Sequence, residues 1–139
     1  MQATNEQASA IPWYYEGLAQ NSFRAVKCRS CGAYTFPPTG CCEHCASWDV
    51  ERVQLSGNAT LLYASHNIVP ACHPRFEKIA PYVYGHLRLA EGPFAQAIVL
   101  GVQPTPRDLR ALFERGPVAV KAETLRMDDL PVIAFRVAG

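Results

Sequence analysis

The sequence predicts a mainly β protein: a short N-terminal helix, a small metal-bound ribbon, and a closed barrel of five strands with one short helix. Two observations carry this prediction. Two C-x-x-C pairs, separated by ten residues, lie in the first third of the chain. From Gly57 onward, β-like runs alternate with turn signals such as 90–93 and 128–131. The chain therefore divides into residues 1–22 (tail and helix), 23–52 (ribbon) and 53–139 (barrel).

The paired cysteines indicate a structural zinc site. Two C-x-x-C pairs at this separation have zinc-ligand spacing, and four thiolates can surround one Zn²⁺ tetrahedrally at about 2.3 Å. Pro37–Gly40 lies between the pairs and reads as the chain reversal that brings them together. Four protein ligands leave no open coordination position, so the metal serves folding. The predicted ligands are Cys28, Cys31, Cys42 and Cys45.

The register of the second pair is ambiguous because Cys41 directly precedes Cys42. Pairing Cys42 with Cys45 preserves the two-residue spacing, so Cys41 is treated as a spare thiol and His44 as a weaker substitute ligand. Two disulfides, or free thiols in the core, remain the alternatives to a metal site.

Local sequence signals predict the helix and strands in the first half of the chain. Ser9 is expected to cap a helix that begins near Pro12. Residues 23–26 and 33–36 bracket the first cysteine pair and read as ribbon strands. Trp48 is expected to pack over the ribbon.

The second half fits an OB-type barrel in order and strand count. Expected strands span 57–69, 82–89, 94–102, 117–126 and 132–137, and Thr105 caps an expected helix over 106–115. In the second of these strands, alternation points Val83, Leu87 and Leu89 inward. The residues on its outer face are Tyr82, Tyr84, His86 and Arg88. The third strand is apolar on both faces, which predicts that the N-terminal helix, the ribbon or another protein covers its outer side.

Composition limits the class of protein. The chain is 49% hydrophobic and 18% charged, with a formal net charge of +1, which is typical of a globular protein without a phosphate-binding stripe. The N-terminus has no signal-peptide pattern, and cysteines in metal spacing favour a reducing cytoplasm.

No catalytic constellation is visible in the sequence. Cys72 and His73 are the nearest approach to a nucleophile with a base, but neighbours in an extended loop point apart, so Cys72 is read as a loop thiol. Tyr82, Tyr84 and Arg88 could stack on nucleic-acid bases, although the balanced charge argues against that partner.

The whole pattern resembles a family of small proteins that fuse a rubredoxin-like zinc ribbon to an OB-fold. The residues that carry the resemblance are Pro12–Leu18, Cys28–Gly32, Phe36–Pro38, Cys42–Cys45, Leu55–Gly57, Pro81–Gly92 and Leu130–Phe135. Members of that family are accessory subunits of thiolase-like enzymes, such as benzoylsuccinyl-CoA thiolase and steroid side-chain aldolases. The resemblance implies a non-catalytic subunit that stabilises a thiolase-type enzyme and helps to line its acyl-CoA channel, with the catalytic Cys and His on the other chain.

Exposed aromatic residues suggest where such a partner would bind. The expected interface residues are Trp13, Tyr14, Tyr15, Leu18, Tyr82 and Tyr84, in an assembly of two plus two chains. The expected contacts to CoA phosphates are Arg75, Lys78 and Arg88. The alternative function is a stand-alone OB-fold module that binds nucleic acid or acyl-CoA.

Overall fold

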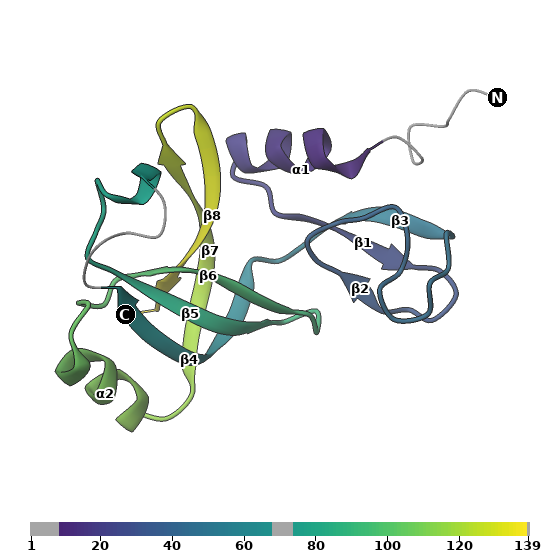
Figure 1. Ribbon diagram of the computed structural model, residues 1–139. Helices are drawn as coiled ribbons and strands as arrows, with labels where there is room; N and C mark the ends of the chain where they lie inside the picture. Colours follow the sequence, from purple (N-terminus) through teal and green to yellow (C-terminus); the bar gives the residue numbers. More distant parts are fainter. Residues whose placement is uncertain (1–8, 68–73, 139) are drawn as a thin grey trace. The chain divides into compact units, whose positions relative to one another are not determined.

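A computed structural model describes residues 9–67 and 74–138 of the chain. Its contacts divide into two compact units (Figure 1). The ribbon unit runs to Ser56 and includes Glu91–Pro93, and the barrel unit comprises Gly57–Ala90 and the residues from Phe94 onward. The Glu91 carboxylate, in the tip of a barrel hairpin, accepts a 3.0 Å hydrogen bond from the Ser56 amide, which joins this tip to the ribbon unit.

The N-terminal helix α1 spans Ala10–Ala19, and Ser9 caps it as predicted by accepting from the Ile11 amide. Gly17 allows Arg24 to cross the helix closely, because a Cβ at this position would lie 2.6 Å from Arg24 Cδ. Arg24 Nη1 then donates to the Trp13 carbonyl at 2.8 Å. This contact holds α1 against the strand that follows it.

The ribbon sheet has three antiparallel strands in the order β2–β1–β3. They are β1 (Arg24–Cys28), β2 (Tyr34–Thr35) and β3 (Val50–Gln54). The sequence anticipated the first two but not β3, which pairs with all five residues of β1. Because β3 extends to Gln54, the ribbon unit continues past the expected limit at residue 52.

Trp48 does not pack over the ribbon as expected. Its side chain is 79% exposed. Around the cysteines, the ribbon has a buried cluster of Val26, Cys28, Cys42 and Val50.

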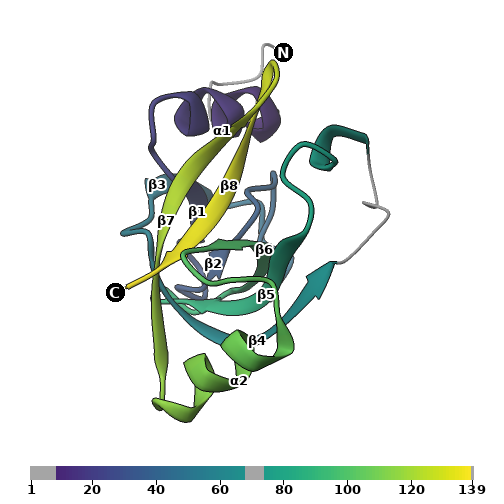
Figure 2. The same cartoon turned by 90° about the vertical axis from the view of Figure 1, so that its left-hand side faces the viewer.

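The barrel is closed, with strand order β4–β5–β6–β8–β7 and a return pairing of β7 with β4. Its strands are β4 (Asn58–Asn67), β5 (Tyr82–Leu89), β6 (Phe94–Leu100), β7 (Val118–Met127) and β8 (Leu130–Val137). A 3₁₀ helix, η1 (Pro74–Phe76), precedes β5, and helix α2 (Pro106–Glu114) connects β6 to β7. Among the described strands, β6 and β8 alone pair in parallel, and β7 and β8 form a long hairpin (Figure 2).

The five strands and single connecting helix confirm the predicted barrel, and Thr105 caps α2 as expected by accepting from the Asp108 amide. The predicted alternation of β5 is also confirmed, since Val83, Leu87 and Leu89 are buried. Gly85 fits among them because a Cβ there would lie 2.5 Å from Leu61 Cδ1. The barrel interior is thus filled by side chains.

The third barrel strand is covered on both sides only in its middle. Ile98 and Val99, which point to opposite faces, are both buried. Phe94, at the start of β6, is 56% exposed. None of the helices in the described ranges is long and apolar enough to cross a membrane.

A substitution at Phe135 tests the assigned barrel core, because this side chain is fully buried. Phe135→Ala should lower the free energy of unfolding by about 3–5 kcal/mol, through lost burial and a residual cavity. Urea unfolding measures this loss. Phe94→Ala is the matched control and should cost less than about 1 kcal/mol. Equal losses for the two variants would contradict the assigned core.

Candidate metal centre

Two backbone turns bring four cysteines together. Cys28 ends β1 and Cys31 follows in the next turn, while Cys42 and Cys45 lie in the loop between β2 and β3. All four Sγ atoms lie within 4.8 Å of one another. Two Sγ–Sγ distances, Cys28 to Cys45 and Cys31 to Cys42, are 3.6 Å. A tetrahedral zinc with Zn–S bonds of about 2.3 Å needs sulfurs about 3.8 Å apart, so the four sulfurs fit this metal.

The two turns have matching backbone geometry. In the first, the Cys31 amide donates to Cys28 Sγ at 3.4 Å and the Gly32 amide to the Cys28 carbonyl at 3.0 Å. In the second, the Ala46 amide donates to the Cys42 carbonyl at 2.9 Å. Gly32 and Ala46 both have positive φ, at 79° and 64°. Glycine adopts this conformation without strain, whereas alanine does so only when the surroundings enforce it.

Hydrogen bonds from backbone amides favour the thiolate form of two of the four cysteines, Cys28 and Cys42. The Cys31 amide lowers the pKa of Cys28 to about 6, and the Cys45 amide lowers the pKa of Cys42. At Cys45, the Ser47 amide lowers the pKa, but the neighbouring cysteines outweigh it and raise the value to about 12. Four adjacent thiols therefore cannot all ionise without a cation among them, and a bound Zn²⁺ supplies that charge.

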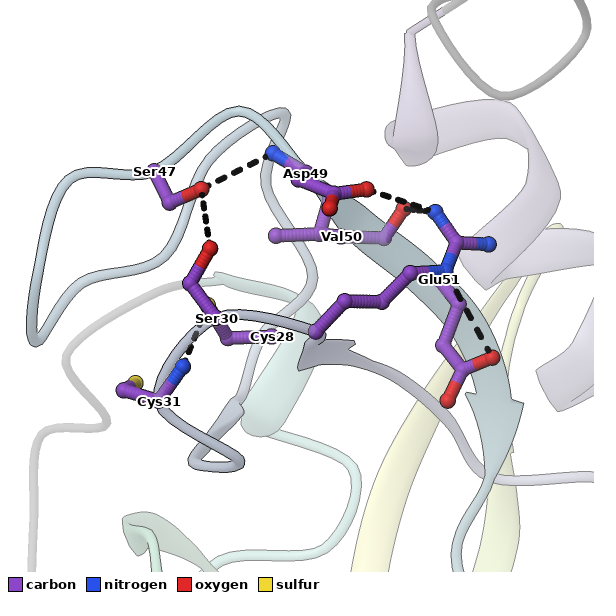
Figure 3. A network of polar contacts seen from close by, with 8 residues as sticks. Cys28, Ser30, Cys31, Ser47, Asp49, Val50 and Glu51 are labelled. Carbon is purple, nitrogen blue, oxygen red and sulfur yellow. Dashed lines mark hydrogen bonds and ion pairs between the residues drawn. The ribbon is translucent and has the colours of Figure 1, made fainter.

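A polar network ties the first turn to the segment that enters β3 (Figure 3). Arg29 Nη1 donates to Asp49 Oδ1 at 3.0 Å and to the Val50 carbonyl at 3.3 Å. The Ser30 and Ser47 hydroxyl oxygens are 3.1 Å apart. These contacts fix the spacing between the two cysteine turns from outside the cluster.

The other two candidate ligands, Cys41 and His44, lie outside the four-cysteine cluster. The Cys41 carbonyl accepts from Thr39 Oγ1 at 2.7 Å. The exposed His44 ring faces the Glu43 carboxylate, with Nε2 and Oε1 3.4 Å apart. The five cysteines within the described ranges are all free of disulfides. The grouping agrees with the register that pairs Cys42 with Cys45.

The aromatic residues of α1 pack mostly within the ribbon unit. Two guanidinium groups lie near the Trp13 ring, with Arg24 Cζ 5.3 Å and Arg52 Cζ 4.8 Å from its centroid. Tyr14 makes an edge contact with Phe36 at 5.9 Å between centroids, and burial raises its pKa to about 12. Of the remaining helix candidates, Leu18 is fully buried, whereas Tyr15 is 38% exposed.

The barrel candidates lie on its outer surface. Tyr84 is exposed, and its hydroxyl donates to Gln96 Oε1 at 3.0 Å. Tyr82 is half-buried against Phe76 of η1. The sequence reading missed Leu62 and Tyr63, which are exposed on β4 at an irregularity in its pairing with β5. Two consecutive large side chains in an otherwise alternating strand were the available signal.

The expected CoA contacts have different surroundings. Lys78 forms an ion pair with Asp128. The Arg88 guanidinium lies 5.7 Å from the centroid of the Phe94 ring. The side chain of Arg75, and the whole of Cys72 and His73, lie outside what the structure describes.

Comparisons with known sequences identify the ribbon. A family model described as the ChsH2 rubredoxin-like zinc ribbon domain matches residues 16–51. A probable enoyl-CoA hydratase alpha subunit of Thermomonospora curvata is 30% identical over 93 residues, covering 66% of this chain and 28% of that protein. A DUF35 domain-containing scaffold protein of Methanocaldococcus jannaschii is 30% identical over 80 residues, covering 57% of this chain and 55% of that protein. The chain thus spans about a quarter and about half of these two relatives.

Two solved structures resemble the chain along nearly its whole length. A chain of the Ltp2-ChsH2(DUF35) aldolase superposes with a TM-score of 0.73 at 26% identity, and the match covers 100% of both chains. A DUF35-family protein of unknown function from Sulfolobus solfataricus has a TM-score of 0.59 at 17% identity, covering 96% of this chain and 89% of that one. The second likeness shows the fold alone.

Replacing one cysteine of the cluster should remove the metal. Cys31→Ser is expected to lose zinc and to unfold or aggregate, because metal binding at such sites supplies folding free energy. Elemental analysis of the purified protein measures zinc per chain. Cys41→Ser is the matched control and should retain about one zinc per chain. Zinc retained in Cys31→Ser but lost in Cys41→Ser would reverse the ligand register.

The metal centre and the barrel together show which known proteins share the architecture of this chain. Residues 16–51 match a zinc ribbon whose four clustered cysteines have the geometry of a structural zinc site. A closed five-strand barrel with one helix follows it. The chain therefore has the zinc-ribbon plus OB-fold architecture of DUF35 proteins, with a ribbon of the ChsH2 type, and the resemblance read from the sequence is confirmed.

Proposed function

We propose that the chain is a non-catalytic accessory subunit of a thiolase-type enzyme that acts on acyl-CoA by thiolysis, retro-aldol cleavage or acyl transfer. The observation that carries this proposal is the full-length likeness to a chain of the Ltp2-ChsH2(DUF35) aldolase, whose name joins a DUF35 chain to a second component. The names of the two curated relatives, a hydratase subunit and a scaffold protein, support the same role.

In this proposal the metal centre has a structural task. Zinc held by four protein ligands has no open position for substrate, so the ribbon contributes shape and stability to the complex. The catalytic Cys and His lie on the partner chain. The proposed ligands are Cys28, Cys31, Cys42 and Cys45, whose thiols need the reducing cytoplasm that we propose as the location.

The partner chain is proposed to contact α1 and the outer barrel surface, in an assembly of two plus two chains. The proposed interface residues are Trp13, Tyr14, Tyr15, Leu18, Tyr82 and Tyr84. Tyr15 is the most exposed of the helix residues in this set. Arg88 is exposed and has no ion pair among the described contacts, so it suits a CoA phosphate better than Lys78, which is paired with Asp128.

The isolated chain should have no turnover. Purified, zinc-loaded protein assayed with acyl-CoA esters should match the no-protein control, because the proposed reacting groups are on the other chain. Co-expression with a thiolase-type partner chain, followed by size-exclusion chromatography, should yield an active complex. Thiolysis by the isolated chain that disappears in Cys72→Ala would contradict the proposal.

The helix contact can be tested separately. Tyr15→Ala should weaken association with the co-expressed enzyme chain by about 1–2 kcal/mol, as truncation of a partly exposed aromatic anchor does. Binding calorimetry measures the loss, and an unchanged zinc content shows that the ribbon is intact. Association as tight as that of the parent protein would mean that α1 only packs on its own unit.

A further inference from the structure

The outer face of strands β4, β5 and β6 forms a continuous surface within the barrel unit. β5 lies between the other two strands and pairs with both. Register places Arg88 opposite Phe94, and His86 between Tyr63 and Gln96. Leu62 is the extra residue where the β4 register shifts, so it and Tyr63 are both exposed. We call this surface the sheet face; its exposed large apolar residues are Leu62, Tyr63, Tyr84 and Phe94.

The sheet face is unusually apolar for the solvent side of a strand. A half-buried antiparallel strand normally alternates apolar residues inward with polar residues outward. Here Tyr63 is 63% exposed and Phe94 is 56% exposed, although the inward-facing Leu61 and Leu87 are fully buried. The barrel interior is already filled, so these rings do not serve its core. Contiguous exposed patches of this kind mark interaction sites.

The side chains of the sheet face are already held in place. The His86 and Phe94 rings stack with centroids 5.5 Å apart and an interplanar angle of 10°. Arg88 lies over the same Phe94 ring, and the Tyr84 hydroxyl is fixed by Gln96. Ordering side chains on binding has an entropic cost, which is smaller where they are held beforehand. The sheet face therefore loses little side-chain entropy when a folded partner binds to it.

The chemistry of the sheet face favours a protein over a nucleic acid. Its paired rows contain one permanent charge, Arg88, and neither lysine nor carboxylate. The residues of these rows whose side chains are described are Thr60, Leu62, Tyr63, Ser65, Tyr82, Tyr84, His86, Arg88, Phe94, Gln96 and the buried Ile98. Nucleic-acid surfaces need several cations to neutralise phosphates. The cores of protein–protein interfaces are enriched in Tyr, Phe and Arg and depleted in Lys, Asp and Glu, and the sheet face has this composition.

We infer that the sheet face is the docking surface for the acyl-CoA enzyme chain, with Tyr63 and Phe94 as its central anchors. This inference rests on the proposed function and adds to it a surface that the sequence reading placed only in part, at Tyr84 and its neighbours. Trp13 is engaged by two arginines of its own unit, so the helix offers less free aromatic surface than the sheet face. β5, at the centre of the sheet face, is paired along both of its edges, so the inferred contact is made by side chains and not by added backbone pairing.

The test measures, by biolayer interferometry, binding of full-length, zinc-loaded protein to a thiolase-type chain identified by co-purification with it. Tyr63→Ala and Phe94→Ala should each raise Kd about 10-fold or more. Two controls should stay within about 3-fold of the parent protein: Tyr63→Phe, which keeps the ring, and Trp48→Ala, which removes a more exposed aromatic from the ribbon. Thermal melting and zinc content confirm that each variant is folded.

Four results would overturn the inference. If the parent binds and both alanine variants bind equally well, the sheet face is excluded while the proposed function stands. If only Trp48→Ala weakens binding, the enzyme docks on the ribbon. If the isolated parent forms a dimer that Tyr63→Ala and Phe94→Ala dissociate, the face joins two copies of this chain. If no thiolase-type chain co-purifies with the parent and binds it, both the inference and the proposed function fail.

Discussion

Four cysteine sulfurs within 4.8 Å of one another form the constraint on which the ribbon unit depends. Their buried members, Cys28 and Cys42, share a buried cluster with Val26 and Val50. Units of this size bury little apolar surface against the conformational entropy of ordering their turns and strands, and they usually need a metal or disulfides. The amide hydrogen bonds and the matching positive-φ turns prepare the site for a cation.

The helix α1 depends on the same ribbon. Arg24 leaves β1, crosses Gly17 and donates to the Trp13 carbonyl, while its guanidinium also lies against the Trp13 ring. Arg52 of β3 approaches that ring too. Because β1 and β3 are fixed by the cysteine turns, the position of α1 follows from the metal site. An aromatic helix that the sequence offered as a partner surface is thus first a part of its own unit.

The barrel, in contrast to the ribbon, is stabilised by strand pairing and core packing. Pairing of residues 58–61 of β4 with residues 118–121 of β7 closes the sheet into a barrel. Phe135 and Leu87 fill the interior, and Gly85 keeps it from being overfilled. The exposed apolar side chains on the outside, such as Tyr63 and Phe94, are not part of this interior. Their presence beside Arg88, on the outer face of three adjacent strands, is therefore informative about binding.

The sequence by itself determined the cysteine pairs, the helix caps at Ser9 and Thr105, the five barrel strands and the alternation of β5. These features are encoded by residues that are close along the chain, through metal-ligand spacing, capping chemistry and the two-residue period of a strand. Their local patterns are readable without knowing which segments meet.

Only the tertiary structure decided the features that depend on pairing between distant residues. Val50–Gln54 became the third ribbon strand because it meets β1, which lies more than twenty residues earlier. Trp48 became exposed, and Trp13 came to lie near two arginines, because strand pairing sets which side chains approach each ring. The irregularity beside Leu62 exists only in the register between β4 and β5. Such contacts join residues that the one-dimensional pattern does not relate, so only the folded chain reveals them.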